Sequence, residues 1–272
     1  MKITFKSNGC EDSWISSIIP LVASMYNVMY GQDNIVLKTQ LSKKESGIDL
    51  SRKEQKNRIE QLRLGINFIS NRMRDGTCTK ELFIEYNNFL QELRGNCNVK
   101  ETGIYSSDYI YEQDKAFHQM LTLAEQCYEN VYMDCGMDLS PVSRELGKKS
   151  DLTFINIYPE KNKSKDVYLD NDFTNPTVCI LMEYEDAIKN KLSNHTYFTY
   201  PFLTPKNIIY IPSCKEFKTA NIESIASTLL YQYIECEPSD SNYLFIQGLK
   251  KVANKINDMA ENVILKIEQR IS

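Results

Sequence analysis

The 272-residue sequence is poor in several residue types on which whole classes of protein depend. It contains only two histidines, His118 and His195, which excludes histidine-rich metal sites and most two-histidine mechanisms. Ten glycines and eight prolines are too few for a collagen-like or low-complexity chain. The net charge of −4 lacks the basic excess that general nucleic-acid binding needs, so we expect no nucleic-acid partner.

Long apolar runs and paired cysteine motifs are also missing. No run reaches the roughly 18 apolar residues of a membrane span. The N-terminal Met-Lys-Ile-Thr-Phe-Lys has no apolar signal-peptide core. The eight cysteines are scattered without a CxxC pair, which argues against a zinc site. We therefore expect no transmembrane segment, and a protein that is cytoplasmic or is secreted into a host cell without a cleavable signal peptide.

The first forty residues predict a strand, a helix and a second strand. Ile3 and Phe5 alternate with polar neighbours, as in a strand. An apolar helical pattern follows from Trp14, Gly31 can end that helix, and residues 34–38 form another apolar run. A strand–helix–strand unit of this length is typical of a parallel sheet.

Helical periodicity is strongest in the middle and at the end of the chain. The spacing of 3, 4, 3 and 4 residues between Ile59 and Met73 predicts a helix, and residues 79–94 predict a second. A third is expected at about 111–132. We expect residues 1–240 to form an α/β domain with a helical insertion at about 52–95. Residues 241–272 should form a C-terminal helix that packs on this domain or extends from it, with a coiled-coil partner as the alternative.

The most informative run is Val167-Tyr168-Leu169-Asp170-Asn171-Asp172. Its apolar residues predict a strand, and two carboxylates stand at its end, where open α/β sheets bind ligands. Carboxylates without histidine or cysteine suit a hard cation such as Mg²⁺ or Mn²⁺. Such an ion can neutralise the charge that develops on a departing diphosphate.

The stretch Ser150-Asp151-Leu152 stands nineteen residues before Asp170. Together with Tyr168–Asp172 it resembles the paired motifs of DXD glycosyltransferases of type A fold, particularly the bacterial toxin and effector branch that includes the large clostridial glucosylating toxins. The resemblance implies a Rossmann-like nucleotide-binding sheet. It also implies that the helical segments are an insertion and a long C-terminal addition.

The resemblance implies specific roles for five residues. Asp151 would bind sugar or ribose hydroxyls, and Asp170 would contact ribose, sugar or the metal. Asp172 would ligate Mn²⁺ or Mg²⁺ on the diphosphate of a UDP-sugar, with Asn171 in the same site. Phe5 would stack on the uracil, with Trp14 as the alternative.

The expected function is therefore transfer of a sugar from a UDP-sugar to an acceptor, which the toxin-like resemblance suggests is a host protein. Two alternatives stay open. Cys10, His195 and Asn207 follow the chain order of a papain-like thiol hydrolase. The helical segments also suit a catalytically inactive protein-interaction module.

Overall fold

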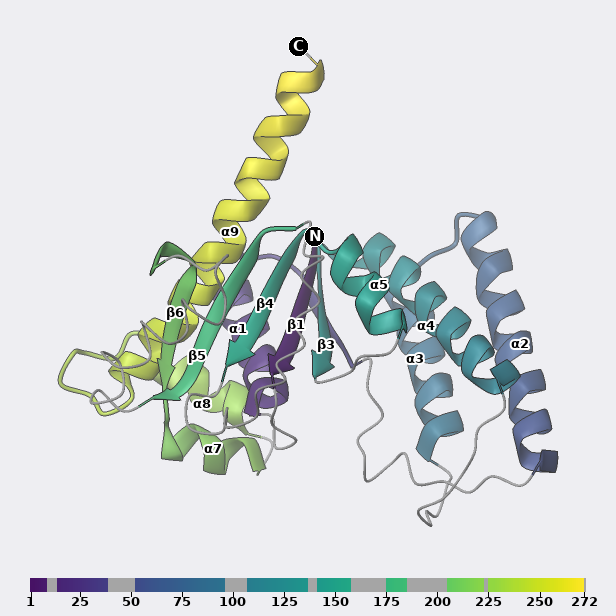
Figure 1. Ribbon diagram of the computed structural model, residues 1–272, viewed down its shortest axis with the longest axis horizontal. Coiled ribbons are helices and arrows are strands. Elements are labelled where there is room, and N and C mark those ends of the chain that lie inside the picture. The colour runs from purple at the N-terminus through teal and green to yellow at the C-terminus, as the bar shows by residue number, and fades with distance from the viewer. Residues whose placement is uncertain are drawn as a thin grey trace. The chain divides into compact units, whose positions relative to one another are not determined.

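The computed structural model describes residues 1–8, 14–38, 52–95, 107–136, 141–157, 175–184, 205–222 and 225–271. The chain forms two compact units (Figure 1). The sheet unit contains Met1–Val36 and Tyr132–Ser272, and the helical unit contains Leu37–Val131. Among the described residues, no helix combines the length and apolar character needed to cross a membrane.

A six-stranded sheet organises the first unit. Its order across the sheet is β2-β3-β1-β4-β5-β6. The pairs β1–β4, β4–β5 and β5–β6 are parallel. The strands are β1 (Lys2–Asn8), β2 (Asn34–Lys38), β3 (Asn130–Gly136), β4 (Leu152–Ile157), β5 (Thr177–Tyr184) and β6 (Ile208–Pro212), the last preceded by the 3-10 turn η1 (Pro205–Asn207).

The strand–helix–strand unit expected at the N-terminus is present. Helix α1 (Trp14–Tyr30) joins β1 to β2 and contains Pro20. Gly31 ends the helix with a φ of 70°, and its N–H donates to the Asn27 carbonyl at 2.7 Å. Glycine suits this position because it adopts the left-handed conformation without a Cβ clash.

Alternation along the central strands separates two faces of the sheet. Ile3 and Phe5 of β1 lie in register with Leu152 and Phe154 of β4, and all four are buried in the main core. That core also contains residues of α1, α7 (Lys215–Ile222), α8 (Ala226–Tyr233) and α9 (Tyr243–Ile271). On the other face, Lys6 lies against Gly147 of α5 (Pro141–Lys149).

Helix α9 approaches the backbone of β6 through Gly248. A Cβ at this position would lie 3.0 Å from the Tyr210 carbonyl oxygen and 3.3 Å from the Ile211 Cα. Further along the same helix, Leu249, Val252 and Ile256 are fully buried in the core. The apolar spacing of this helix therefore serves packing within the core of the sheet unit.

Replacing Gly248 by alanine is expected to destabilise the protein. Alanine favours a helix over glycine by about 1 kcal/mol, but its Cβ has to push α9 away from β6, which costs about 1–3 kcal/mol. We expect a net loss of about 1 kcal/mol in the free energy of unfolding, measured by urea denaturation. Lys251→Ala, at an exposed position of α9, is the matched control and should change little. A Gly248→Ala variant as stable as the wild type would contradict the close helix–strand contact.

The described part of the second unit contains the helices α2 (Arg52–Arg74), α3 (Lys80–Gly95) and α4 (Ser107–Cys127). Leu62, Ile66 and Ile69 of α2 are buried, as the periodicity predicted. Arg63 Nε donates to Glu112 Oε1 at 2.7 Å and joins α2 to α4. The ring of Phe83 packs edge-on against Tyr128, with centroids 5.4 Å apart.

Two local predictions were wrong. The helix expected at about 111–132 ends at Cys127, and residues 130–136 form β3. Every residue of β3 is buried, so the strand carries no polar–apolar alternation to distinguish it from the preceding helix. The apolar spacing of Ile222, Leu229 and Tyr233 predicts a single helix, whereas the structure divides these residues between two helices, α7 and α8.

Candidate functional site

The centre of the sheet carries an aromatic layer followed by a polar one. The Phe5 ring stacks on the rings of Phe154 in β4 and Tyr132 in β3. The ring centroids are 4.9 Å apart for Phe5–Phe154 and 6.2 Å apart for Phe5–Tyr132. Side chains two residues apart share a face. The next residues on the same face, toward the carboxyl ends of these strands, are therefore Asp134, Ser7 and Asn156. We call these three residues the polar layer.

Two residues of the polar layer are buried, Ser7 is half-buried, and the hydrogen bonding of the layer is incomplete. Asn156 is 0 % exposed and Asp134 is 4 % exposed. Within the described part of the chain, both amide atoms of Asn156 and the Ser7 hydroxyl have no hydrogen-bond partner. Ser7 and Asn156 are paired directly across β1 and β4. Buried polar atoms without partners are rare in folded proteins, so these atoms indicate a bound water or ligand.

The aromatic layer also contains a polar atom without a hydrogen-bond partner among the residues that the structure describes, the buried hydroxyl of Tyr132. Burial raises the pKa of Tyr132 above its usual value, with a smaller contribution from Tyr26. The hydroxyl is therefore neutral at physiological pH and can both donate and accept a hydrogen bond.

Asp134 gives the polar layer a carboxylate. Its Oδ1 accepts a hydrogen bond from the Gly136 N–H at 3.1 Å, which closes the turn at the end of β3. Gly136 has a φ of 47°, in the region that glycine tolerates best. One carboxylate, one hydroxyl and one amide form a donor set that suits a hydrated Mg²⁺ ion or a polar ligand.

The sequence prediction missed all three residues as a site. Asp134 was not a candidate because the sequence pattern did not predict the strand β3 that contains it. The run Ser7-Asn8-Gly9 predicts a turn, whereas Ser7 is part of β1. The available signal was the apolar run Val131–Met133 followed by Asp-Cys-Gly, which is the same strand-then-acid pattern that drew attention to Asp170.

Of the expected site residues, the structure describes Phe5 and Asp151, and Asp151 does not lie at this edge. Phe5 is fully buried in the aromatic layer. Asp151 precedes β4 at the amino-terminal edge of the sheet, where its Oδ2 accepts from the Lys2 N–H at 2.7 Å. Asp170, Asn171 and Asp172 lie outside the described residues, so their role as metal ligands stays a prediction. Within the described ranges, no three His, Cys, Asp or Glu side chains are grouped as metal ligands.

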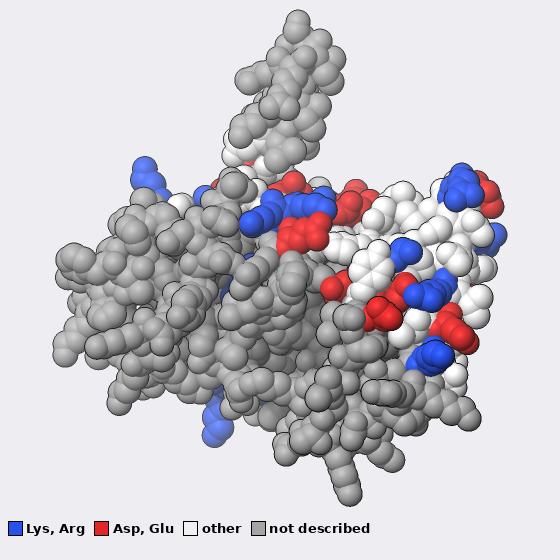
Figure 2. All heavy atoms as spheres, turned by 45° about the vertical axis from the view of Figure 1, so that its right-hand side comes forward, with Lys and Arg blue, Asp and Glu red and all other residues white. Residues whose placement is uncertain are grey.

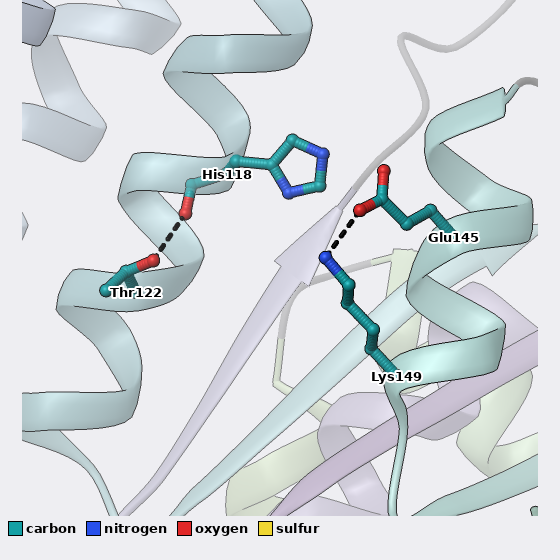
Figure 3. Close-up of polar contacts among 4 residues, drawn as sticks. All are labelled: His118, Thr122, Glu145 and Lys149. Atoms are coloured by element: carbon teal, nitrogen blue, oxygen red, sulfur yellow. Dashed lines mark hydrogen bonds and ion pairs between the residues drawn. The ribbon is translucent and has the colours of Figure 1, made fainter.

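Of the three residues of the thiol-hydrolase alternative, the structure describes only Asn207. Cys10 and His195 lie outside the described residues, and Asn207 ends the turn η1 before β6. The other histidine, His118, lies in α4, where its carbonyl accepts from the Thr122 hydroxyl at 2.9 Å (Figure 3). The second contact drawn in Figure 3 is the ion pair between Lys149 and Glu145 along α5.

Solved structures with this arrangement of elements identify the fold. No family model and no curated protein sequence matches the chain. A ParA family ATPase from Chlorobium tepidum TLS matches with a TM-score of 0.53 at 11% identity, over 93% of this chain and 98% of its own. A chain of the MinC:MinD cell division protein complex from Aquifex aeolicus matches with a TM-score of 0.50 at 9% identity, over 95% of this chain and 96% of its own. The septum site-determining protein MinD from Pyrococcus horikoshii OT3, complexed with Mg-ADP, has a TM-score of 0.49 at 12% identity, over 96% of this chain and 98% of its own.

The fold is therefore that of the ParA/MinD P-loop ATPases, and the type A glycosyltransferase assignment is wrong. An α/β fold with a parallel sheet is confirmed. The glycosyltransferase function, the UDP-sugar and the toxin-like role fall with the resemblance, and Mn²⁺ loses its support. The ParA/MinD-like fold also gives no support to the thiol-hydrolase alternative or to the catalytically inactive interaction module. Short acidic motifs after a strand recur in many α/β folds, which explains the misassignment.

Proposed function

We propose that this protein binds a nucleotide together with Mg²⁺ at the carboxyl edge of β3, β1 and β4. The observation that carries the proposal is the polar layer, in which the buried Ser7 hydroxyl oxygen and the buried amide atoms of Asn156 lack partners in the described structure. Open α/β sheets bind ligands at the carboxyl ends of strands, where the order of connections reverses. Here the chain leaves β1 through α1 for β2, which lies beyond β3 on one side of β1, while β4 and β5 lie on the other side.

The fit to a nucleotide differs between the polar layer and the segment that follows β1. Asp134 fits Mg²⁺, because carboxylates ligate this ion directly or through water. The whole sequence contains no GxxxxGK[ST] motif, in which a lysine contacts the phosphates. Between β1 and α1 it has Gly-Cys-Glu-Asp-Ser, with Glu11 and Asp12 in place of a Gly-Lys pair before Ser13. Residues 9–13 therefore carry two negative charges, whereas the corresponding segment of a P-loop protein carries the positive charge of its lysine.

The charge balance leads to a specific expectation for binding. The carboxylates of Glu11, Asp12 and Asp134 repel phosphate oxygens unless a cation lies between them. Mg²⁺ supplies that positive charge when it is bound. Nucleotide binding should therefore depend on Mg²⁺ more strongly than in a protein with a P-loop lysine.

Hydrolysis should be slow even where binding occurs. In P-loop NTPases the lysine helps to hold the β- and γ-phosphates while charge shifts during transfer. Removing one preorganised donor of this kind typically lowers the turnover number by a factor of about 10²–10³. Asn156 and Ser7 would orient polar groups of the ligand, and neither can replace the missing charge. We infer a binding protein with weak ATPase activity.

Calorimetric titration of the full chain with ATP and ADP tests this proposal. We expect binding in Mg²⁺ and none in chelator. Asp134→Asn should weaken binding at least tenfold, which is about 1.4 kcal/mol. Asp151→Asn is the matched control, since Asp151 lies at the opposite edge of the sheet and should leave affinity unchanged. UDP-glucose should not bind in either condition.

A gain-of-function variant sharpens the test. Glu11→Gly combined with Asp12→Lys restores a Gly-Lys-Ser sequence before α1. This variant should bind ATP more tightly and depend less on Mg²⁺. Failure of ATP and ADP to bind the wild type at any Mg²⁺ concentration would refute the proposal, and so would identical losses in Asp134→Asn and Asp151→Asn.

A further inference from the structure

An apolar groove lies between two helices of the helical unit. It has a volume of about 390 Å³ and is lined by residues of α2 and α3: Gln61, Leu64, Gly65, Phe68, Glu85, Tyr86 and Phe89. Leu64 is 69% exposed and Phe68 is 53% exposed. Exposed apolar side chains gathered around a groove are typical of interaction sites. We call this feature the α2–α3 groove.

The floor of the α2–α3 groove is formed by close helix packing. A Cβ at Gly65 would lie 2.5 Å from Phe89 Cε1, so glycine allows the Phe89 ring to cross α2 closely. Tyr86 is buried beside it, and within the described residues its hydroxyl has no hydrogen-bond partner. The groove therefore has an apolar floor.

The two sides of the groove carry opposite charges. On α2, the Arg72 guanidinium lies over the Phe68 ring, 6.0 Å from its centroid. On α3, Glu85 lines the groove. Neither side chain makes an ion pair with another described residue. Figure 2 likewise shows basic and acidic side chains interspersed with uncharged surface where the described part of the chain is visible.

The charge pattern of α2 disfavours a second copy as the occupant. Arg58 and Arg72 lie seven residues before and after Gly65, on the same side of the helix. A two-fold contact centred on Gly65 with antiparallel α2 helices would bring Arg58 of one copy beside Arg72 of the other. Like charges at such a contact cost affinity.

We propose that the α2–α3 groove binds an amphipathic helix of a partner protein. A groove between two packed helices accepts a third helix through apolar residues at i, i+3, i+4 and i+7. The partner helix carries an acidic residue on the edge that faces Arg72 and a basic residue on the edge that faces Glu85. This recognition surface lies within the helical unit and needs no residue of the polar layer.

A synthetic helical peptide tests the groove in the full-length protein. The probe has leucines at i, i+3, i+4 and i+7, a glutamate on one edge and a lysine on the other. A second probe carries glutamate in place of that lysine. In fluorescence anisotropy, the wild type should bind the lysine probe, and Phe68→Glu should weaken binding at least tenfold. Ile84→Glu is the control, because Ile84 is 50% exposed on α3 but does not line the groove.

A charge exchange completes the design. Glu85→Lys should reverse the preference and favour the glutamate probe, which a nonspecific apolar contact would not do. Circular dichroism of each variant verifies the fold. The proposal is overturned if neither probe binds, if Ile84→Glu weakens binding as much as Phe68→Glu, or if sedimentation shows self-association of the wild type that Phe68→Glu abolishes.

Discussion

Replacing Phe5 by alanine is expected to remove about 3–5 kcal/mol from the free energy of unfolding. The Phe5 ring is fully buried and stacks on Phe154 and Tyr132. Its removal leaves a cavity in the centre of the sheet, where the surrounding strands relax little. Domains of this kind are stable by about 5–15 kcal/mol, so the variant should unfold at clearly lower urea concentration.

The control for this prediction is the same substitution at an exposed ring. Phe68→Ala in α2 removes a side chain that is 53% exposed, and it should cost less than about 1 kcal/mol. Both variants are compared by urea denaturation followed by circular dichroism. Equal losses at the two positions would contradict the assignment of Phe5 to the core.

Replacing Asn156 by leucine should stabilise the free protein while it removes nucleotide binding. The two side chains have the same branched shape, and leucine eliminates two buried amide atoms that lack partners in the described structure. Each unsatisfied buried polar group costs about 1–3 kcal/mol, so we expect a gain of at least about 1 kcal/mol. The loss of ATP binding follows because Asn156 lies in the polar layer.

Thr153→Val provides the matched control on the same strand. Thr153 is also fully buried with an unpartnered hydroxyl among the described residues, but it faces the opposite side of the sheet. This variant should gain stability and retain ATP affinity. Thermal unfolding and calorimetric titration separate the two effects. A destabilised Asn156→Leu would mean that ordered water or another group already satisfies the amide, which counts against an open ligand position.

The features that sequence patterns predicted correctly are local. The unit β1–α1–β2 follows from alternation in a strand, a helical period and the stop at Gly31, all within forty residues. The helix through Ile59–Met73 follows from one apolar stripe. Each of these signals depends on neighbours in the chain, so no knowledge of the tertiary fold was needed.

Two features were misjudged because their signals are not local. The central strand β3 is buried throughout, so its residues show no period that separates strand from helix. The motifs around Asp151 and Asp170 suggested one edge of a sheet, yet Asp151 precedes its strand and bonds to Lys2 at the amino edge. A motif gives residue types and spacing, but strand order determines which edge they reach.

The sequence by itself determined the α/β class, the first strand–helix–strand unit and the helical character of residues 52–95. It also shows that residues 9–13, which follow the first strand, contain no lysine. The tertiary structure alone decided that Asp134, Ser7 and Asn156 share one layer, since they come from three strands far apart in the chain. The physical reason is that secondary structure depends on side chains within a few residues of one another. A site in a parallel sheet, by contrast, depends on which strands become neighbours and in which register they pair.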